Sequence, residues 1–399
     1  MLVRYTRDDS GKTIRQALIY TAEEHGIRPE DIHPDAVKIA GRLRSSGHKA
    51  YIVGGAVRDL MLGKHPKDFD IATDAQPNRI RRLFRNSRVI GRRFRLVHIF
   101  FNDHVVEVST FRSENSKGFQ NEYGEIEEDV MRRDFTANAL YYDPNTQRVI
   151  DYVGGVADIR AHRLQPIIPL DRIFAEDPVR MIRALKYSVG GELKMDRRLR
   201  RQMKKSTELL APISPSRITE EVFKIMLSGR SARVIAACVE YGLFHHMLPV
   251  AAELLAADDA YRTAFFHRLE AFDREVTEGG ETRRARAIAY LSADFLYTKT
   301  ASGAASRINF TEAFADIKGF IQPIVPANKD VEMGLVYLVR RRKNYRKAGE
   351  LELTPPSERM HEPEQEEPVA KERKPRSRGR RSRGSRTTKR STSATDGGN

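Results

Sequence analysis

The spacing of hydrophobic residues changes near residue 174, and this change constrains the fold of the 399-residue chain more than any other feature. Before it, short apolar runs alternate with Gly and Pro, which is typical of strands and helices mixed in one domain. From about Phe174 to Lys347, apolar residues recur at helical spacing, as in Val179, Ile182 and Leu185, and strand-like alternation is not evident. The sequence therefore predicts an α/β head followed by an all-α remainder.

Local patterns place the elements of the head. The strands are expected at Ala50–Val53, Phe69–Ala72, Val97–Phe101 and Val105–Ser109. The helices are expected at Asp35–Ser45, Ala56–Leu62, Asn78–Phe84 and Thr136–Tyr141, with a further one between Lys12 and Glu24. We divide the chain into an N-terminal extension (1–34), a head with a small mixed sheet (35–163), a helical neck (164–230), a helical body (231–350) and a tail (351–399).

The tail is predicted to be disordered and basic. Residues 355–368 are rich in Pro and Glu and 371–390 in Arg, Ser and Gly, so few apolar groups offset an ordering cost of ~1–2 kcal/mol per residue. Of the net charge of +16, the Lys371–Arg390 segment contributes +10, from eleven Lys or Arg and one Glu. Such an excess predicts a polyanionic partner, most simply nucleic acid, although a solubilising terminus is the alternative.

Two absences from the sequence narrow the class of protein. No stretch approaches the ~20 consecutive apolar residues that span a bilayer, and Met1–Lys12 lacks the apolar core of a signal peptide. We therefore expect a cytoplasmic protein without a membrane partner. The single cysteine, Cys238, excludes an internal disulfide and a cysteine zinc site, and its apolar neighbours predict a buried position on a helix.

Three carboxylates form the first chemical motif. In Asp68-Phe69-Asp70, residues i and i+2 of a strand point to the same face, so both carboxylates project together. Glu107 lies in an otherwise apolar strand, on the face opposite to Val106 and Val108. Each piece alone is common in solvated turns or at sheet edges. Together, three hard oxygen donors on adjacent strands suit two Mg²⁺ ions.

A glycine pair forms the second motif. The strand ending at Val53 runs through Gly54-Gly55 into a helix whose first turn carries Arg58. Glycine lets the backbone approach a phosphate closely, and a helix N-terminus offers unpaired N–H groups. The spacing matches neither a dinucleotide fingerprint nor a Walker loop, so a tight structural turn is the alternative.

The order of these motifs resembles that of the class II transfer RNA nucleotidyltransferase and bacterial poly(A) polymerase family. The resemblance covers roughly residues 35–250. It rests on five motifs in sequence: Gly54-Gly55-Ala56-Val57-Arg58-Asp59, Lys67-Asp68-Phe69-Asp70, Glu107 through Arg112, Arg132-Arg133-Asp134-Phe135-Thr136-Ala137-Asn138-Ala139-Leu140, and Glu176-Asp177-Pro178-Val179-Arg180-Met181-Ile182-Arg183-Ala184.

The resemblance implies a function for each part of the chain. It implies that 35–163 is a nucleotidyltransferase head, that 164–230 reads the nucleobase and that 231–350 binds RNA. It makes Asp68 and Asp70 the metal ligands, with Glu107 as third catalytic carboxylate. The implied nucleotide-binding residues are Gly54, Gly55 and Arg58 for the triphosphate, Arg133, Asp134 and Asn138 for the ribose, and Asp177, Arg180 and Arg183 for the base.

Two interpretations of the last two groups follow from spacing. Asp134 and Asn138 are four residues apart and would share one face of a helix that begins here. Spacings of three would put Asp177, Arg180 and Arg183 along one side of a helix. A surface ion-pair cluster and an i,i+3 pair worth ~0.2–0.5 kcal/mol are the alternatives. After Arg183 the chain departs from the family: Lys186 keeps the charge but not the planar fork of arginine.

Within the family, the segment Val89–Ile99 favours polyadenylation. Its Arg92-Arg93-Phe94 run resembles the poly(A) polymerase version, and we expect Arg92, Arg93 and the Lys371–Arg390 segment to bind RNA. The resemblance then implies AMP transfer from ATP to RNA 3′ ends, RNA tailing and decay as the role, and RNA-decay proteins as candidate partners. CCA addition to transfer RNA is the alternative in the same class. A non-catalytic RNA-binding protein with an inactive nucleotidyltransferase shell is the alternative in another class.

Overall fold

The computed structural model describes residues 2–7, 13–91, 95–102, 104–113, 123–190, 193–280, 283–300, 307–339 and 351–353. All of them belong to the unit Met1–Glu358. Three sequence-predicted features therefore lie outside the described residues: Arg92, Arg93 and the Lys371–Arg390 segment.

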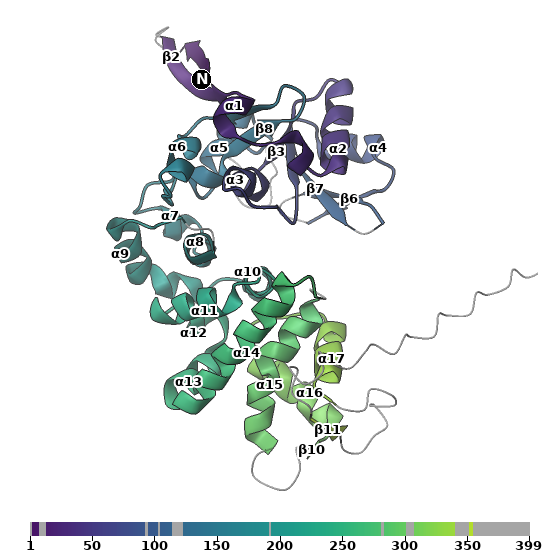
Figure 1. Ribbon diagram of the computed structural model, residues 1–399, viewed down its shortest axis with the longest axis vertical. Helices are drawn as coiled ribbons and strands as arrows, with labels where there is room; N and C mark the ends of the chain where they lie inside the picture. Colours follow the sequence, from purple (N-terminus) through teal and green to yellow (C-terminus); the bar gives the residue numbers. More distant parts are fainter. Residues whose placement is uncertain are drawn as a thin grey trace, which may run out of the picture. The chain divides into compact units, whose positions relative to one another are not determined.

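A nine-stranded mixed sheet forms the centre of the head (Figure 1). Its order is β1-β2-β9-β8-β3-β4-β7-β6-β5. Only β4 and β7 run parallel among the paired strands of this sheet, in the part of the chain that is described. The strands are β1 (Leu2–Arg7), β2 (Thr13–Tyr20), β3 (Ala50–Val53), β4 (Asp70–Thr73), β5 (Ser87–Ile90), β6 (Leu96–Phe100), β7 (Val105–Thr110), β8 (Leu140–Asp143) and β9 (Arg148–Asp151).

The predicted α/β head is confirmed, and most of its expected elements are found within one residue of their predicted ends. The helices of this half are α1 (Ala22–His25), α2 (Pro34–Ser45), α3 (Gly55–Met61), α4 (Pro77–Leu83), α5 (Ile126–Met131) and α6 (Gly155–Arg160). Two 3-10 turns, Pro29–Asp31 and Thr136–Asn138, also occur.

The helix expected between Lys12 and Glu24 is wrong. Thr13–Tyr20 forms β2, and only the four residues of α1 are helical in that stretch. β2 pairs with both β1 and β9, and the second pairing joins Tyr20 to Val149. Leu18–Tyr20 thus pair with a strand more than a hundred residues away, and the earlier part of β2 pairs with β1, which the local pattern does not reveal.

The sheet is covered on both faces. On one face, Ile52, Ile71 and Val108 join the large core that α2, α3 and α4 complete. On the other face, Val53 and Ala72 pack with residues of α5 in a smaller cluster. Alternate residues of each strand therefore face different helices, and polar side chains at the edge of the smaller cluster are free to line a cavity.

The rest of the described chain is almost entirely helical, as predicted. Its helices are α7 (Ile173–Glu176), α8 (Val179–Gly190), α9 (Arg197–Ser206), α10 (Pro215–Met226), α11 (Ser231–Glu240), α12 (Phe244–Met247), α13 (Pro249–Ala257), α14 (Asp259–Thr277), α15 (Arg284–Thr300), α16 (Phe310–Phe320) and α17 (Asn328–Tyr337). The exception is a two-stranded pair, β10 (Arg307–Ile308) with β11 (Leu351–Glu352). Residues 351 and 352, expected in a disordered tail, are thus paired.

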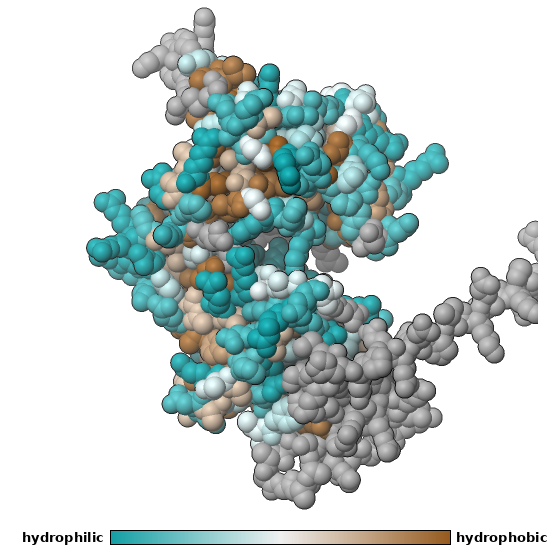
Figure 2. Space-filling model, in the orientation of Figure 1, coloured by the Kyte–Doolittle hydropathy of each residue, from teal (hydrophilic) through white to brown (hydrophobic). Residues whose placement is uncertain are grey.

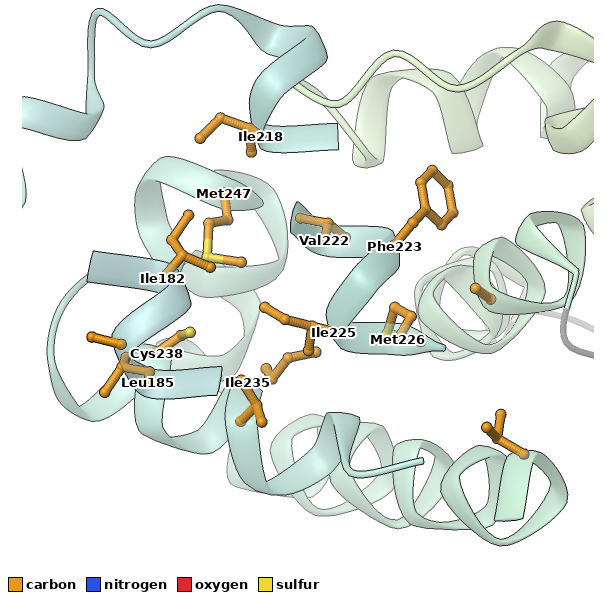
Figure 3. Close-up of a cluster of buried hydrophobic side chains, with 14 of the residues drawn as sticks. Ile182, Leu185, Ile218, Val222, Phe223, Ile225, Met226, Ile235, Cys238 and Met247 are labelled. Carbon is orange, nitrogen blue, oxygen red and sulfur yellow. The ribbon is translucent and has the colours of Figure 1, made fainter. Parts of the chain in front are cut away.

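Helices α8, α10 and α11 share a core in which Cys238 is fully buried (Figure 3). Ile182 and Leu185 of α8 contribute to it with Val222 and Ile225 of α10. Burial raises the pKa of the Cys238 thiol to about 12, so the thiol stays protonated and apolar at neutral pH. The prediction of a small buried hydrophobe at this position is confirmed.

The visible surface is largely hydrophilic (Figure 2). Hydrophobic residues are visible at the β1–β2 end, and Leu2 of β1 is exposed. In the described ranges, none of the helices is both long and apolar enough to cross a membrane.

Candidate active site

Asp70 and Glu107 are brought side by side by the one parallel strand pair. Asp70 is the first residue of β4, and the register of β4 with β7 pairs Ile71 with Val108, so Asp70 lies level with Glu107. Val106 and Val108 are buried, which places Glu107 on the opposite face, as predicted.

Asp68 was expected on the same strand, but it precedes β4 and is exposed. The side chain of the next residue, Phe69, is buried and anchors this segment. We call Asp68, Asp70 and Glu107 the acidic edge.

The acidic edge carries negative charge that the surrounding protein offsets only in part. The pKa of Asp70 is raised to about 6, first by desolvation and then by repulsion from Glu107 and Asp68, while Lys224 and Arg133 partly offset this rise. The Asp70 side chain is open to water from the cavity, and protein atoms crowd it from the other directions, which accounts for the desolvation. A cluster of hard oxygen donors whose charges repel each other is chemically suited to a divalent cation such as Mg²⁺.

The three carboxylates are not gathered tightly enough to define ion positions. Glu107 Oε1 lies 3.1 Å from Nε2 of His98, its cross-strand partner on β6, and accepts a hydrogen bond when that nitrogen is protonated. Among the residues that the structure describes, only one group of three or more potential ligands has its ligand atoms within 4.8 Å of one another, and it does not include the acidic edge. The acidic edge therefore offers donors of the right chemistry without displaying a two-ion geometry.

The glycine pair forms the turn between β3 and α3. Gly54 has φ of +71°, a backbone conformation that side chains other than glycine rarely adopt, and a Cβ there would lie 3.6 Å from an Arg133 nitrogen and 3.9 Å from an Asp70 oxygen. A side chain at this position would occupy the space between the Arg133 guanidinium and the Asp70 carboxylate. Gly54 therefore keeps the approach to Asp70 open.

Arg58 is held in place from several sides. It donates to the side-chain oxygen of Asn138 at 2.6 Å and pairs with Asp59 at 2.7 Å. Its guanidinium lies 4.6 Å from the ring centre of Tyr187, which comes from α8. The charge of Arg58 is thus fixed at the boundary between the head and α8.

Asp134 and Asn138 lie together, but not on the helix that the sequence predicted. Thr136–Asn138 is a 3-10 turn, and the chain then enters β8, because pairing with β3 and β9 takes over from local propensity. Asn138 still donates to Asp134 Oδ1 at 3.1 Å. Arg183 forms a 3.1 Å ion pair with the other oxygen of Asp134, at an angle that does not make a hydrogen bond.

Burial alone would raise the pKa of Asp134, but the Arg183 guanidinium, with hydrogen bonds from Asn138 and the Phe135 amide, lowers it below the usual value. Asp134 is therefore a buried anion at neutral pH.

Arg133 is anchored by a residue that the sequence analysis missed. Asp129 of α5 accepts from Arg133 at 2.9 Å and from the Tyr141 hydroxyl at 2.6 Å. Arg133 also donates to the Asn138 carbonyl at 3.1 Å. Asp129 precedes Arg133 by four residues in an acidic helix, and that i,i+4 spacing is the signal that could have identified it.

Asp177, Arg180 and Arg183 all line one cavity, but they do not share one helix face. Asp177 lies between α7 and α8 in an extended conformation, whereas Arg180 and Arg183 belong to α8. Arg180 is buried and donates to the Ile173 and Arg132 carbonyls, both at 3.2 Å. We call these three residues the neck group.

Asp177 already has a cationic partner. Arg217, in the first turn of α10, donates to both of its carboxylate oxygens, at 2.7 and 2.8 Å. No pattern in the sequence links residues 177 and 217, so tertiary packing alone brings them together. Lys186, the departure noted above, pairs with Glu221 of α10 at 3.3 Å.

A cavity of about 860 Å³ is lined by the acidic edge, the glycine turn and the neck group. Every described residue predicted as catalytic or nucleotide-binding lines it, and basic lining side chains outnumber acidic ones by twelve to seven. The predicted lining residues are Gly54, Gly55, Arg58, Asp68, Asp70, Glu107, Arg133, Asp134, Asn138, Asp177, Arg180 and Arg183. A cavity that is lined mainly by Lys and Arg, and that also contains the acidic edge, suits a polyphosphate together with divalent cations.

Two family models match the chain. Residues 50–165 match the one described as the poly A polymerase head domain, and residues 192–255 match the one described as a probable RNA and SrmB-binding site of polymerase A. The first range contains the acidic edge and the glycine turn. The second begins after α8 and includes Arg217.

Three similar proteins come from both branches of one family. Poly(A) polymerase I of Salmonella typhi is 40% identical over 247 residues, which cover 58% of this chain and 53% of that protein. The CCA-adding enzyme of Bacillus licheniformis is 34% identical over 224 residues, 55% of this chain and 56% of that enzyme. The crystal structure of the Bacillus stearothermophilus CCA-adding enzyme in complex with CTP is 25% identical, with a TM-score of 0.49 and coverage of 77% of this chain and 84% of that one.

This chain thus spans about half the length of the curated relatives it matches.

Proposed function

We propose that this chain, which belongs to the poly(A) polymerase and CCA-adding family of nucleotidyltransferases, transfers AMP from ATP to RNA 3′ ends without a template. The observation that carries the proposal is the cavity itself, where the acidic edge, whose charge is only partly offset, lies among twelve Lys and Arg side chains. Head residues 35–163 would perform the transfer, 164–230 would read the base and 231–350 would bind RNA.

The acidic edge would hold divalent cations, Mg²⁺ in the cell. Asp68 and Asp70 are the proposed ligands, with Glu107 beside them, and such ions supply Lewis acidity and neutralise phosphate charge. The pKa of Asp70, raised to about 6, is what a ligand cluster without its cations is expected to have. Two ions are proposed because the reaction has an attacking and a leaving oxygen to stabilise.

The basic residues that line the cavity would bind and orient ATP. Arg58, fixed by Asn138 and Asp59, presents its guanidinium beside the glycine turn, where the triphosphate is proposed to lie. Asn138 and Asp134 would contact the ribose, since an amide and a carboxylate can recognise a 2′-hydroxyl that both donates and accepts. Arg133 is held too firmly by Asp129 and Tyr141 to move far, so we assign it a fixed charge beside Asp70.

The neck group would read the base edge. Asp177 can accept from an exocyclic amine, and Arg183 can donate to ring nitrogens or carbonyls. Because Arg217 binds both oxygens of Asp177, it fixes the direction in which Asp177 faces the base. Arg180 already donates to two backbone carbonyls, so we assign it a positioning role rather than direct base contact.

Polyadenylation is favoured over CCA addition by the higher identity to poly(A) polymerase I and by the Arg92-Arg93 segment. RNA binding by Arg92, Arg93 and the Lys371–Arg390 segment, a cytoplasmic location and RNA-decay partners are parts of this proposal. CCA addition remains the second candidate because CCA-adding enzymes are 34% identical to the same region.

Primer extension on a short unstructured RNA, with Mg²⁺ and each nucleoside triphosphate separately, tests the proposal. A long ladder with ATP alone is the expected result. Extension confined to transfer RNA ends, with CTP required before ATP, would establish CCA addition instead. No incorporation with any RNA, despite binding, would favour a non-catalytic RNA-binding protein.

A further inference from the structure

A second group of metal-type ligands lies away from the acidic edge. His33, Asp35 and His104 each offer one ligand atom, and these atoms all lie within 4.8 Å of one another. His33 immediately precedes α2, Asp35 is in its first turn, and His104 lies in the turn between β6 and β7. The side chains of His33, His104 and Asp35 are 42%, 29% and 18% exposed, and the Nε2 atom of His104 itself is buried.

One carboxylate oxygen of Asp35 lies near both imidazoles. Asp35 Oδ1 binds Lys38 Nζ at 2.9 Å, which leaves Oδ2 on the side of the two imidazoles. That oxygen lies 3.5 Å from His104 Nε2 and 4.0 Å from His33 Nδ1. His33 Nδ1 also accepts from the Asp35 amide at 3.2 Å, so an ion bound through Nδ1 would replace that hydrogen bond. Two ligands at usual zinc distances in a tetrahedral site are about 3.3 Å apart, so small side-chain movements suffice.

The ring positions are fixed by packing. The two imidazole centres are 4.4 Å apart, and the His104 ring stacks on Phe101 with a centroid distance of 4.8 Å. The Phe101 amide also donates to the His104 carbonyl, which closes the β6–β7 turn. The lysine partner of Asp35 and this stacking act as the outer-shell contacts that orient ligands in metal sites.

The donor set differs from that of the acidic edge and selects another ion. Imidazole nitrogen suits Zn²⁺, Co²⁺ and Ni²⁺, whereas Mg²⁺ favours oxygen ligands and retains water. We propose that His33, Asp35 and His104 bind one transition-metal ion of the Zn²⁺ class, with water completing a tetrahedral shell. A cavity of about 150 Å³ beside His33 and His104 gives the ion and its water room.

The position of this site connects it to the acidic edge. Asp68 and Phe69 line the same small cavity, and Asp68 also lines the large one. An ion here would tie the start of α2 to the turn that leads into β7, the strand that carries Glu107. The site would therefore brace the acidic edge without taking part in the reaction.

Co²⁺ binding to the full chain tests the proposal. The protein is stripped with a chelator and titrated with Co²⁺ in excess Mg²⁺, which occupies oxygen sites, and the visible absorption of tetrahedral Co²⁺ is recorded. One saturable site is expected in the wild type, and Zn²⁺ should displace the Co²⁺. His104→Gln should weaken binding by more than about 100-fold, beyond what loss of an outer-shell partner does.

A second variant separates metal loss from unfolding. His33 caps α2 by accepting from the Asp35 amide at 3.2 Å, and Asn is a better N-cap residue, so His33→Asn should preserve folding while removing the imidazole. His267→Ala, at an exposed position of α14, is the matched control and should titrate like the wild type. Wild-type protein without a tetrahedral Co²⁺ spectrum, or His33→Asn and His104→Gln with wild-type affinity, would overturn the proposal. Neither result depends on nucleotide transfer, so the proposed function is tested separately.

Discussion

The acidic edge and the neck group lie in the same cavity but differ in how their charges are satisfied. The pKa of Asp70 is raised by desolvation and by repulsion from Glu107 and Asp68, whereas Asp177 and Arg180 already have partners in the protein. A charged group with a fixed protein partner is preorganised, and one without a partner needs a ligand to complete it. The comparison therefore supports the proposal that the acidic edge binds cations and that the neck group reads the base through hydrogen bonds.

Removal of an acidic-edge carboxylate should have the largest effect. Asp68→Ala or Asp70→Ala should lower nucleotide incorporation by at least about 10³-fold, which corresponds to ~4 kcal/mol of transition-state stabilisation. RNA affinity should change little, because these residues are proposed to hold ions rather than RNA. Single-turnover incorporation and RNA binding by the same variants measure both. Asp171→Asn, an exposed residue that does not line the cavity, is the control.

Near-normal turnover in either alanine variant would show that the replaced carboxylate is not needed for the reaction. It would contradict the role proposed for the acidic edge.

Asn138 lies between Arg58 and Asp134, and its loss should have an intermediate effect. It accepts from Arg58 and donates to Asp134, so Asn138→Ala should reduce the preference for ATP over dATP by about 10- to 100-fold. The ratio of kcat/KM values for the two nucleotides is the readout. Asn145→Ala, at an exposed turn, should leave the ratio unchanged. An unaltered ratio in Asn138→Ala would place ribose recognition elsewhere.

Arg217 sharpens the comparison on the neck side. Arg217→Ala frees Asp177 to rotate, and the preference for ATP over CTP should fall about 10-fold, or ~1.4 kcal/mol. Arg284→Ala is a matched control because Arg284 forms a similar two-bond pair with Glu220 away from the cavity. Equal nucleotide preferences in the wild type and Arg217→Ala would mean that Asp177 does not read the base.

The smallest expected effect is on stability. The folded-state pKa of Asp70, about 6, lies above the usual aspartate value of 3.8, so the folded state holds the proton more tightly. The resulting loss of stability develops as pH rises from about 4 to 6 and is complete above 6. Asp70→Asn should therefore stabilise the metal-free protein at pH 7.5, by about 1 kcal/mol because cavity water screens the charge, and not at pH 4.

Thermal unfolding in chelator at both pH values measures this difference. A stability gain of equal size at pH 4 and pH 7.5 would show that charge repulsion is not its cause.

Local patterns predicted the strands that carry Asp70 and Glu107, because β4 is a short, mostly buried run and β7 alternates between exposed and buried residues. They failed where long-range pairing decides the structure. β2 is a strand because β1 and β9 flank it, and β8 cuts short the helix expected at Thr136. Arg217 escaped notice for the same reason, since only the packing of α10 brings it to Asp177. Asp129, by contrast, was within reach of an i,i+4 argument.

Cation binding by the acidic edge is the central claim, and direct counting of ions tests it most directly. Mn²⁺, a paramagnetic substitute for Mg²⁺, is titrated by electron paramagnetic resonance in the presence of a non-hydrolysable ATP analogue. The His33→Asn background keeps the histidine cluster from contributing. Two ions are predicted to bind, and Asp70→Asn in the same background should lose at least one. Equal numbers of ions, bound with equal affinity, with and without Asp70→Asn would contradict the account.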